Sequence, residues 1–342
     1  PISIGGFTFV VFKTYKMNDM KGKQGMVCMG LLLVLSSCHT GKQITASGLQ
    51  RKDFQTEVNG QHTDLFTLSN KQGMEVCITN YGARVVSILV PDRNGKREDV
   101  VCGFSTITEY MEQRQNFGST VGRYIGRILN ARFTLDGVEY KLVPNNGKSG
   151  HISHGGNPGF ADRIWKVEQA DTHRVRLSYL SPDGENGFPG NLKVTLVYSL
   201  GEDDNALDLT YEATTDAPTV LNLSHHSFFN ISGNFTKSVE DQQLWVDADR
   251  FTPYDDKKCV TGEYLQVAGT PLDFRMPHAI GECIDADHPQ LKVVNGYDHT
   301  WELNTKGDDT RPAAWVYDPA SGRKMEIFTT EPGMQIYTGN GL

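Results

Sequence analysis

Two adjacent histidines, His225 and His226, lie in the stretch of residues 222–233, where hydroxyl, amide and aromatic side chains surround them. Imidazole gains and loses a proton near neutral pH, so this stretch could carry acid–base chemistry. We expect it to follow a buried strand over residues 218–221. Successive side chains of a strand point to opposite faces. One histidine of the pair is therefore expected to face a pocket, and the other to have a structural role.

Two arginines, Arg123 and Arg127, lie four residues apart among glycines and apolar residues in segment 118–132. At least one guanidinium is expected to be partly buried. A buried guanidinium is costly unless it meets a carboxylate or an oxygen-rich ligand. A surface loop with two solvated arginines is the alternative that spacing alone leaves open.

A third polar segment, residues 145–156, contains His151 and His154, and His154 is followed by two glycines. Glycine allows the backbone to approach a ligand closely on that side of the ring. Imidazoles also bind zinc, but the chain has no H-E-x-x-H motif, and further ligands would have to come from distant segments. The sequence therefore predicts no metal site.

Asp298 lies between Tyr297 and His299, just after a strand that we expect over residues 291–294. Taken alone, an aspartate in this position is more often a turn carboxylate than a catalytic one.

The chain from residue 54 onward reads as short strands of period two, separated by turns rich in Gly, Asn and Asp. Residues 131–142 have the pattern of a β-hairpin with Asp136-Gly137 at its turn, and only residues 105–113 look helical. Roughly twenty short strands and almost no helix indicate an all-β fold, a large antiparallel β-sandwich over residues 51–342.

Composition restricts the partners. The 342 residues carry a net charge of −8, with an isoelectric point near 5.7. No stretch concentrates enough Lys and Arg to neutralise a phosphate backbone, so no nucleic-acid partner is expected. A neutral or weakly polar small ligand fits better.

The N-terminal part has the pattern of an export signal. Residues 1–16 are interpreted as an upstream or non-native segment, and residues 17–38 as a signal peptide with an apolar run at 27–35. That run is too short for a bilayer span, which needs about 20 residues. The small residues before Cys38 resemble a bacterial lipoprotein processing site, which predicts lipidation of Cys38 and a tether over residues 39–50. An ordinary cleaved signal peptide is the alternative; either predicts export to the periplasm or outer membrane.

Four cysteines remain outside the leader: Cys77, Cys102, Cys259 and Cys283. Their spacing has neither the density of a disulfide scaffold nor a C-x-x-C pair. We expect unpaired, mostly buried thiols.

Taken together, the polar segments form an ordered set of six motifs that closely resembles the aldose 1-epimerase, or galactose mutarotase, family from about residue 54 to the last residue. The motifs are Gly122-Arg123-x-x-Gly126-Arg127-Ile128, His154-Gly155-Gly156, residues 222–230, residues 269–275, Gly296-Tyr297-Asp298-His299 and residues 329–340. Their common order makes the resemblance far more specific than any single motif.

The resemblance implies a many-stranded antiparallel β-sandwich that interconverts the α and β anomers of an aldohexose without cofactor or metal. His226 matches the family's general acid, and His154 matches the histidine before the glycine pair, which we also count as catalytic. Arg127 matches the substrate-contacting arginine, while Asp298 and Gln335 match positions that bind sugar hydroxyls. An imidazole suits the acid role because it can donate a proton to the ring oxygen and recover it near neutral pH.

Several positions depart from the family pattern. Gly126 and His225 each stand where an asparagine is usual, and Glu331 replaces a glutamine. In the family, the general base is a glutamate about 30 residues beyond the last motif, and no glutamate of this chain matches it. We therefore expect the base, together with closing strands, to lie beyond Leu342.

The alternative functions are a binding protein and a glycosidase. A catalytically silent carbohydrate-binding lipoprotein would keep the sugar-contacting residues without the base. A glycosidase would need two carboxylates about 5 to 9 Å apart, and the sequence offers no convincing pair. The expected partner is a small sugar, the expected membrane contact is only through the lipid anchor, and the expected state is a monomer or weak dimer.

Overall fold

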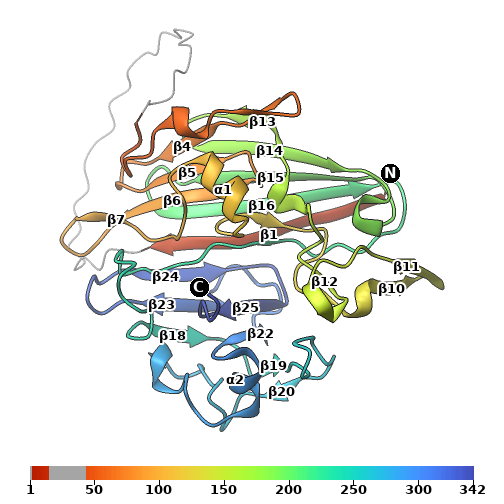
Figure 1. Cartoon of the computed structure of the whole chain (residues 1–342). Coiled ribbons are helices and arrows are strands. Elements are labelled where there is room, and N and C mark those ends of the chain that lie inside the picture. The colour runs from red at the N-terminus through yellow and green to blue at the C-terminus, as the bar shows by residue number, and fades with distance from the viewer. Residues whose placement is uncertain (1, 15–43) are drawn as a thin grey trace.

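The computed structural model describes residues 2–14 and 44–342 (Figure 1). The lipidation site predicted at Cys38, the signal peptide and residues 39–43 of the predicted tether lie outside the described residues. Residues 44–50 lie against the domain: Ile44 forms a β-bridge with Gln50, and the Ser47 amide donates to Glu75 Oε1 at 3.1 Å.

A nine-stranded antiparallel sheet runs through the molecule (Figure 1). Its strands, in spatial order, are β13 (Lys166–Ala170), β14 (Arg174–Ser181), β15 (Leu192–Leu200), β16 (Asn205–Thr215), β1 (Ile2–Thr14), β24 (Lys324–Phe328), β23 (Ala314–Tyr317), β18 (Gln243–Val246) and β21 (His278–Ala279). Strand β1 belongs to the segment interpreted as upstream sequence. Its backbone pairs with β16 on one side and with β24 on the other.

Strand β16 shows how period-two patterning builds the sheet. Leu207, Leu209 and Tyr211 are at most 1% exposed, whereas the alternate residues Thr210 and Glu212 lie on the opposite, more exposed face. Alternation of this kind buries one face of a strand and leaves the other to water.

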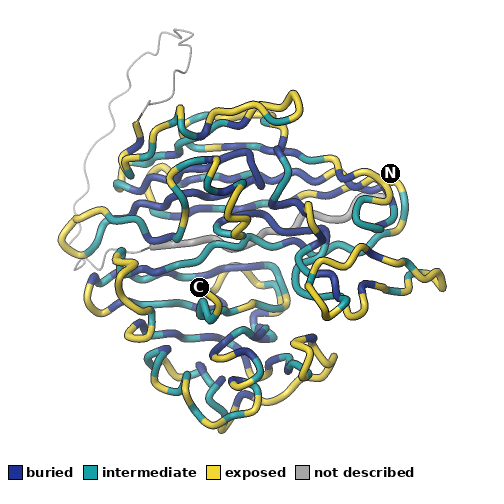
Figure 2. The backbone as a smooth tube through the Cα atoms, in the orientation of Figure 1, coloured by how far each residue is buried: buried dark blue, intermediate teal, exposed yellow. Residues whose placement is uncertain are grey.

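Two four-stranded sheets pack against the large sheet through one shared apolar core. The first contains β4 (Leu65–Ser69), β5 (Glu75–Thr79), β6 (Arg84–Pro91) and β7 (Arg97–Asp99), and the second contains β20 (Leu265–Gln266), β19 (Arg250–Thr252), β22 (Asp298–Glu302) and β25 (Gly333–Tyr337). Figure 2 shows the resulting run of buried backbone through the middle of the molecule. Sheets in face-to-face contact confirm the predicted β-sandwich class.

Helix α1 (Ile107–Gln113) lies where the sequence predicts the single helix. Thr106 caps it: the Glu109 amide donates to Thr106 Oγ1 at 3.2 Å, and the Thr106 amide donates to Glu109 Oε2 at 2.9 Å. Such a capping box satisfies amides that have no partner within the helix. Ile107 and Tyr110 then pack in a second cluster on the outer face of the β4–β7 sheet.

Helix α2 (Pro289–Val294) corrects the prediction of a strand over residues 291–294. Pro289 occupies the start of the helix, where its missing N–H costs nothing, and His288 caps it by accepting from the Gln290 amide at 3.3 Å. The apolar residues Leu291 and Val294 face the core at helical rather than strand spacing.

The predicted strand over residues 218–221 is also wrong. These residues form no strand, and the first pairing after them is a bridge between Asn222 and Tyr124. Pro218 has no N–H to give to a strand ladder. The hairpin prediction is confirmed: Asp136 and Gly137 have φ of 50° and 79° at the turn, as a type I′ turn requires.

Short ladders and single turns complete the described chain. The ladders are β2 (Glu57–Val58) with β3 (Gln61–His62), β8 (Thr120–Val121) with β17 (Ser224–His225), β9 (Arg127–Ile128) with β12 (Ile152–Ser153), and β10 (Arg132–Leu135) with β11 (Val138–Lys141). The 3-10 turns are η1 (Arg51–Phe54), η2 (Leu129–Ala131), η3 (Gly147–Ser149), η4 (Phe160–Asp162), η5 (Glu185–Gly187) and η6 (Ile280–Glu282).

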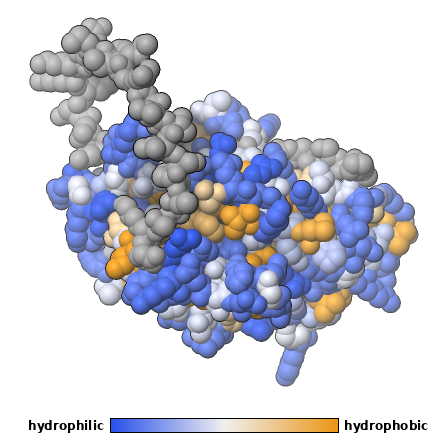
Figure 3. Space-filling view, turned by 90° about the horizontal axis from the view of Figure 1, so that it is seen from above, coloured by the Kyte–Doolittle hydropathy of each residue, from blue (hydrophilic) through white to orange (hydrophobic). Residues whose placement is uncertain are grey.

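The cysteines outside the leader are free, as predicted: Cys77 and Cys259 are buried, and Cys102 and Cys283 are half-buried. Across the described ranges, no helix has the length and apolar character needed to cross a membrane. On the face seen in Figure 3, apolar side chains lie in small separate patches among hydrophilic ones. Scattered patches of this size are ordinary for a water-exposed surface.

The core between the sheets makes a prediction. Replacing Leu209 by Ala should lower the free energy of unfolding by about 2–5 kcal/mol, because it removes buried methyl groups and leaves a cavity. Glu212→Ala, on the exposed face of the same strand, should change it by at most about 0.5 kcal/mol. Urea unfolding followed by tryptophan fluorescence measures both. Equal effects would contradict the assignment of the two faces.

Candidate functional site

The candidate site lies where two short ladders meet the β19–β22–β25 sheet. Pairing of β9 with β12 sets Arg127 opposite Ser153, so that His154 follows directly beside it. His226 follows β17, whose His225 pairs with Thr120 of β8. These ladders bring together residues that are nearly 100 positions apart in the chain.

The rings of His154 and His226 are in contact. Their centroids lie 5.2 Å apart with the planes nearly perpendicular. His225 instead has its ring 5.8 Å from that of Tyr198, and its Nδ1 lies 3.1 Å from Ser227 Oγ. The adjacent histidines thus have different environments, and His226 is the one beside the other predicted site residues.

Backbone hydrogen bonds hold His226 in place. Its amide donates to Ser119 O at 2.8 Å, and its carbonyl accepts from the Gly118 amide at 3.0 Å. Phe228 supports the ring at a centroid distance of 5.1 Å and itself contacts Tyr337 at 5.7 Å. The imidazole is therefore oriented before any ligand arrives.

His154 adopts a left-handed backbone conformation with φ of 52°. Its Nδ1 accepts from the Gly126 amide at 3.3 Å, which leaves the proton of the neutral ring on Nε2. A Cβ on Gly155, the next residue, would lie 1.8 Å from Gly122 O. Glycine is thus required beside this histidine for steric reasons, because the two segments approach so closely.

The two arginines of segment 118–132 have different roles. Arg123 is only 1% exposed, and its guanidinium donates to Ser181 Oγ at 2.9 Å, to Pro182 O at 2.9 Å and to Pro189 O at 2.7 Å. This confirms that one guanidinium is buried, although its partners are neutral oxygens rather than a carboxylate. Arg127 is half-buried in the site and donates from Nη1 to Lys258 O at 3.0 Å.

Asp298 and Gln335 lie on adjacent strands. Gln335 Nε2 donates to Asp298 Oδ1 at 2.7 Å and lies 3.4 Å from the Tyr254 hydroxyl. The Thr300 hydroxyl donates to the other end of the same amide, Gln335 Oε1. Strand pairing explains this, since Thr300 is directly opposite Gln335.

Burial and charge set the protonation states. Burial raises the pKa of Asp298, while the hydrogen bond from Gln335 and the charge of Arg127 oppose the rise. Burial lowers the pKa of His154 to about 3, with the nearby His226 and Arg127 adding to the effect. Burial also lowers the pKa of His226, and the Arg84 guanidinium lowers it further. Both histidines are thus mainly neutral at pH 7 in the free protein.

His151 is not part of the site. It is 1% exposed, and its Nδ1 accepts from the Asn130 amide at 3.0 Å. Within residues 2–14 and 44–342, no three His, Cys, Asp or Glu side chains cluster so as to hold a metal ion.

Several contributors to the site were not predicted. Thr300 could have been found, because it lies two residues after Asp298 and so shares its face of the strand. Tyr254 and the Lys258 carbonyl carry no sequence signal, since they reach the site through a loop. Arg84 is buried and donates to Phe117 O at 2.7 Å, from a strand about 140 residues before His226.

Comparison with known proteins supports one family. A profile of the family described as aldose 1-epimerase matches residues 64–342. Galactose mutarotase of Sus scrofa is 38% identical over 277 residues, which cover 81% of this chain and 78% of that protein. Aldose 1-epimerase of Escherichia coli K12 is 36% identical over 284 residues, covering 83% and 81% respectively.

Solved structures agree in fold. Galactose 1-epimerase from Lactobacillus acidophilus NCFM superposes with a TM-score of 0.74 at 30% identity, covering 84% of this chain and 82% of that one. An aldose epimerase homologue from C. elegans gives a TM-score of 0.75 at 31% identity, with 82% and 83% coverage.

The pKa of His154 makes a prediction about stability. Between about pH 6.5 and about pH 3, the unfolded chain binds a proton that the folded histidine does not, so the free energy of unfolding should fall as pH falls through this window. His154→Asn, which tolerates the positive φ, should reduce this dependence. His225 and His299, whose pKa values burial lowers to about 3 and about 4, should keep the rest of it. Urea unfolding at pH 7 and pH 5 measures it, and NMR titration of the ring checks the cause. A His154 midpoint near 6.5 would contradict the prediction.

Proposed function

The chain belongs to the aldose 1-epimerase family, and from that premise we propose that it interconverts the α and β anomers of aldohexoses such as galactose and glucose. Mutarotation requires a proton donor for the ring oxygen, a proton acceptor for the anomeric hydroxyl and groups that hold the sugar in one orientation.

One observation carries the proposal. The rings of His154 and His226 lie 5.2 Å apart. The positive charge of Arg127 lowers the pKa of His154 and opposes the rise in the pKa of Asp298. Asp298 accepts a hydrogen bond from Gln335. Five residues from five separate segments thus form one polar site. Hydroxyl-binding groups next to a proton donor are what ring opening of a sugar needs.

His226 acts as the acid in this proposal. Its lowered pKa makes the protonated ring a minor species at pH 7 but a stronger donor when it forms. As the bond between C1 and the ring oxygen breaks, the imidazolium gives its proton to that oxygen. After the aldehyde end rotates, ring closure returns the proton to His226.

The other residues orient the sugar. The neutral His154 presents its Nε2 proton, because Nδ1 already accepts from Gly126. Arg127, Asp298 and Gln335 offer donors and acceptors to hydroxyl groups and fix which face of the ring meets His226. At Gly126, where the family usually has asparagine, a Cβ would meet no atom within 4 Å apart from its chain neighbours, so the space at this position is open.

The base stays a prediction. The family resemblance assigns it to a glutamate that no glutamate of this chain matches, while the described residues offer the donor side and the hydroxyl contacts.

The acid assignment is tested by His226→Asn. Polarimetry of fresh α-D-glucose and α-D-galactose should show that this variant loses about 10²–10⁴-fold in rate while the fold is retained, because the proton donor is gone.

The matched control is His225→Asn, which should lose far less because its ring contacts Tyr198 instead of the site. Comparable losses in the two variants would contradict the acid assignment. Sugar binding without any acceleration by the wild-type protein would instead favour the silent carbohydrate-binding alternative.

We also propose export to the periplasm or outer membrane with a lipid anchor on Cys38, on the strength of the leader pattern in residues 17–38. Processing before Cys38 would remove strand β1 from its place between β16 and β24. In a bacterial host, the wild-type protein should be found in the membrane fraction, and Cys38→Ser should release it or block its processing. Cys28→Ser, within the apolar run, is the matched control and should change neither. Mass spectrometry of the mature N-terminus detects a lipid on Cys38 directly, and an unmodified Cys38 would refute the proposed lipid anchor.

A further inference from the structure

Tyr254 is held in a fixed position at the candidate site. Its amide donates to Gln290 Oε1 at 2.8 Å, and its carbonyl accepts from Gln290 Nε2 at 3.0 Å. Gln290 belongs to helix α2, so this helix fixes the backbone at Tyr254. The Tyr254 ring contacts the buried ring of His299 at a centroid distance of 5.5 Å. The phenol therefore has a set direction before any ligand arrives.

The loop that carries Tyr254 is closed on itself and tied to the site. The Asp255 amide donates to Cys259 O at 2.9 Å, and Asp255 Oδ1 accepts from the Cys259 amide at 2.9 Å. Arg127, a predicted sugar contact, donates to Lys258 O of the same loop at 3.0 Å. The loop thus links Tyr254 to Arg127.

The Tyr254 hydroxyl meets the donor end of the Gln335 side-chain amide. Gln335 Nε2 lies 2.7 Å from Asp298 Oδ1 and 3.4 Å from Tyr254 Oη. An amide nitrogen carries two hydrogens, so Asp298 and Tyr254 each accept one of them. Oε1 of the same amide accepts from Thr300, and these partners together fix which way the amide points.

The proton of the Tyr254 hydroxyl is left for a ligand. Tyr254 Oη accepts from Gln335, and among the residues that the structure describes no acceptor receives the phenol proton. Burial raises the pKa of Tyr254, and the charge of Asp298 adds to the rise. Gln335 and Arg127 oppose this rise only in part, so the hydroxyl keeps its proton at neutral pH.

A hydrogen-bond donor and an acceptor therefore lie on the same amide nitrogen. Asp298 can accept further hydrogen bonds, since a carboxylate has about four lone-pair sites and Gln335 occupies one. A sugar hydroxyl both donates and accepts. One such hydroxyl can donate to Asp298 while it accepts from Tyr254.

We propose that Tyr254 is a substrate-binding residue whose hydroxyl donates to one sugar hydroxyl, with Asp298 accepting from the same group and Gln335 aligning both. This inference rests on the proposed function and adds to it a residue that determines which sugars bind. The pair selects for the contacted hydroxyl, because a sugar without it would leave the phenol proton and the carboxylate without that partner.

The test begins with Tyr254→Phe, which removes the donor and keeps the ring on His299. We expect the Kd for D-glucose and D-galactose to rise about three- to tenfold, because one neutral hydrogen bond is lost. NMR titration with sugars at anomeric equilibrium measures Kd. In kinetics the same factor should appear in KM, with kcat retained.

Monodeoxy derivatives of glucose and galactose show whether the phenol acts directly. For the derivative that lacks the contacted hydroxyl, the wild-type protein and Tyr254→Phe should bind equally. The other derivatives should keep the three- to tenfold difference. Non-additivity of this kind identifies a pairwise contact, whereas a structural effect of the substitution would weaken binding of every sugar alike. An equal loss on every derivative, or no loss on any, would overturn the inference.

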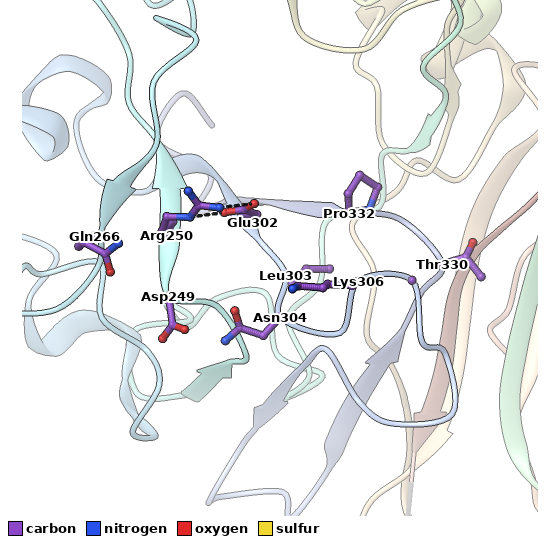
Figure 4. Close-up of a pocket in the computed structure, with 10 residues that line it drawn as sticks. Asp249, Arg250, Gln266, Glu302, Leu303, Asn304, Lys306, Thr330 and Pro332 are labelled. Carbon is purple, nitrogen blue, oxygen red and sulfur yellow. Dashed lines mark hydrogen bonds and ion pairs between the residues drawn. The ribbon is translucent and has the colours of Figure 1, made fainter.

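Tyr264→Phe is the matched control. Tyr264 is exposed, and its ring lies 4.9 Å from the Arg250 guanidinium. Arg250 is paired with Glu302 at the other end of β22 from Asp298, where both line a pocket of about 540 Å³ (Figure 4). This variant should leave every Kd unchanged, and a loss equal to that of Tyr254→Phe would contradict the assignment.

Equilibrium binding separates this inference from the proposed function. Kd is measured on sugars whose anomers have already equilibrated, so it does not depend on catalysis. If the wild-type protein bound hexoses without accelerating mutarotation, the proposed function would fail, and the deoxy sugars would still decide the role of Tyr254. Absence of any hexose binding would overturn both.

Discussion

Burial of apolar side chains between the nine-stranded sheet and the two smaller sheets is the interaction on which the rest of the structure depends. Trp301 and Phe251 are at most 1% exposed because their faces of β22 and β19 close this core. The same alternation turns Asp298 and Thr300 outward. Packing of the apolar side chains on one face of each strand therefore fixes where the polar side chains of the other face point. The candidate site is rigid because the core behind it is packed.

Two buried guanidinium groups also hold distant segments of the chain together. Arg84 and Arg123 are held mostly by backbone carbonyls instead of carboxylates. Arg123 thereby ties the loop after β14 to the segment that leads to Arg127. The charge of Arg84 helps to keep His225 and His226 neutral. A structural cation thus tunes the proton affinity of a proposed acid, which links folding to chemistry.

Much of the fold could be predicted from the amino-acid sequence. The hairpin at Asp136-Gly137 and the helix over residues 105–113 were predicted because their signals are local. The prediction of a strand over residues 291–294 was wrong because a short apolar run fits the period of a helix as well as that of a strand. Pro289 is a signal for the start of a helix. Tyr254 and the Lys258 carbonyl could not be predicted, since a charged loop outside the regular strands carries them to the site.

The sequence by itself determined the family resemblance, the all-β class and the identity of the polar residues, because motif order and period-two alternation are properties of the chain. The resemblance already singled out His226, but only the tertiary structure showed that its ring contacts that of His154 and that a polar face runs on from Asp298 to Glu302. Those relations depend on pairing between segments far apart in the chain, here β8 with β17 and β19 with β22. Pairing of this kind is set by how the whole core packs, which local patterns do not encode.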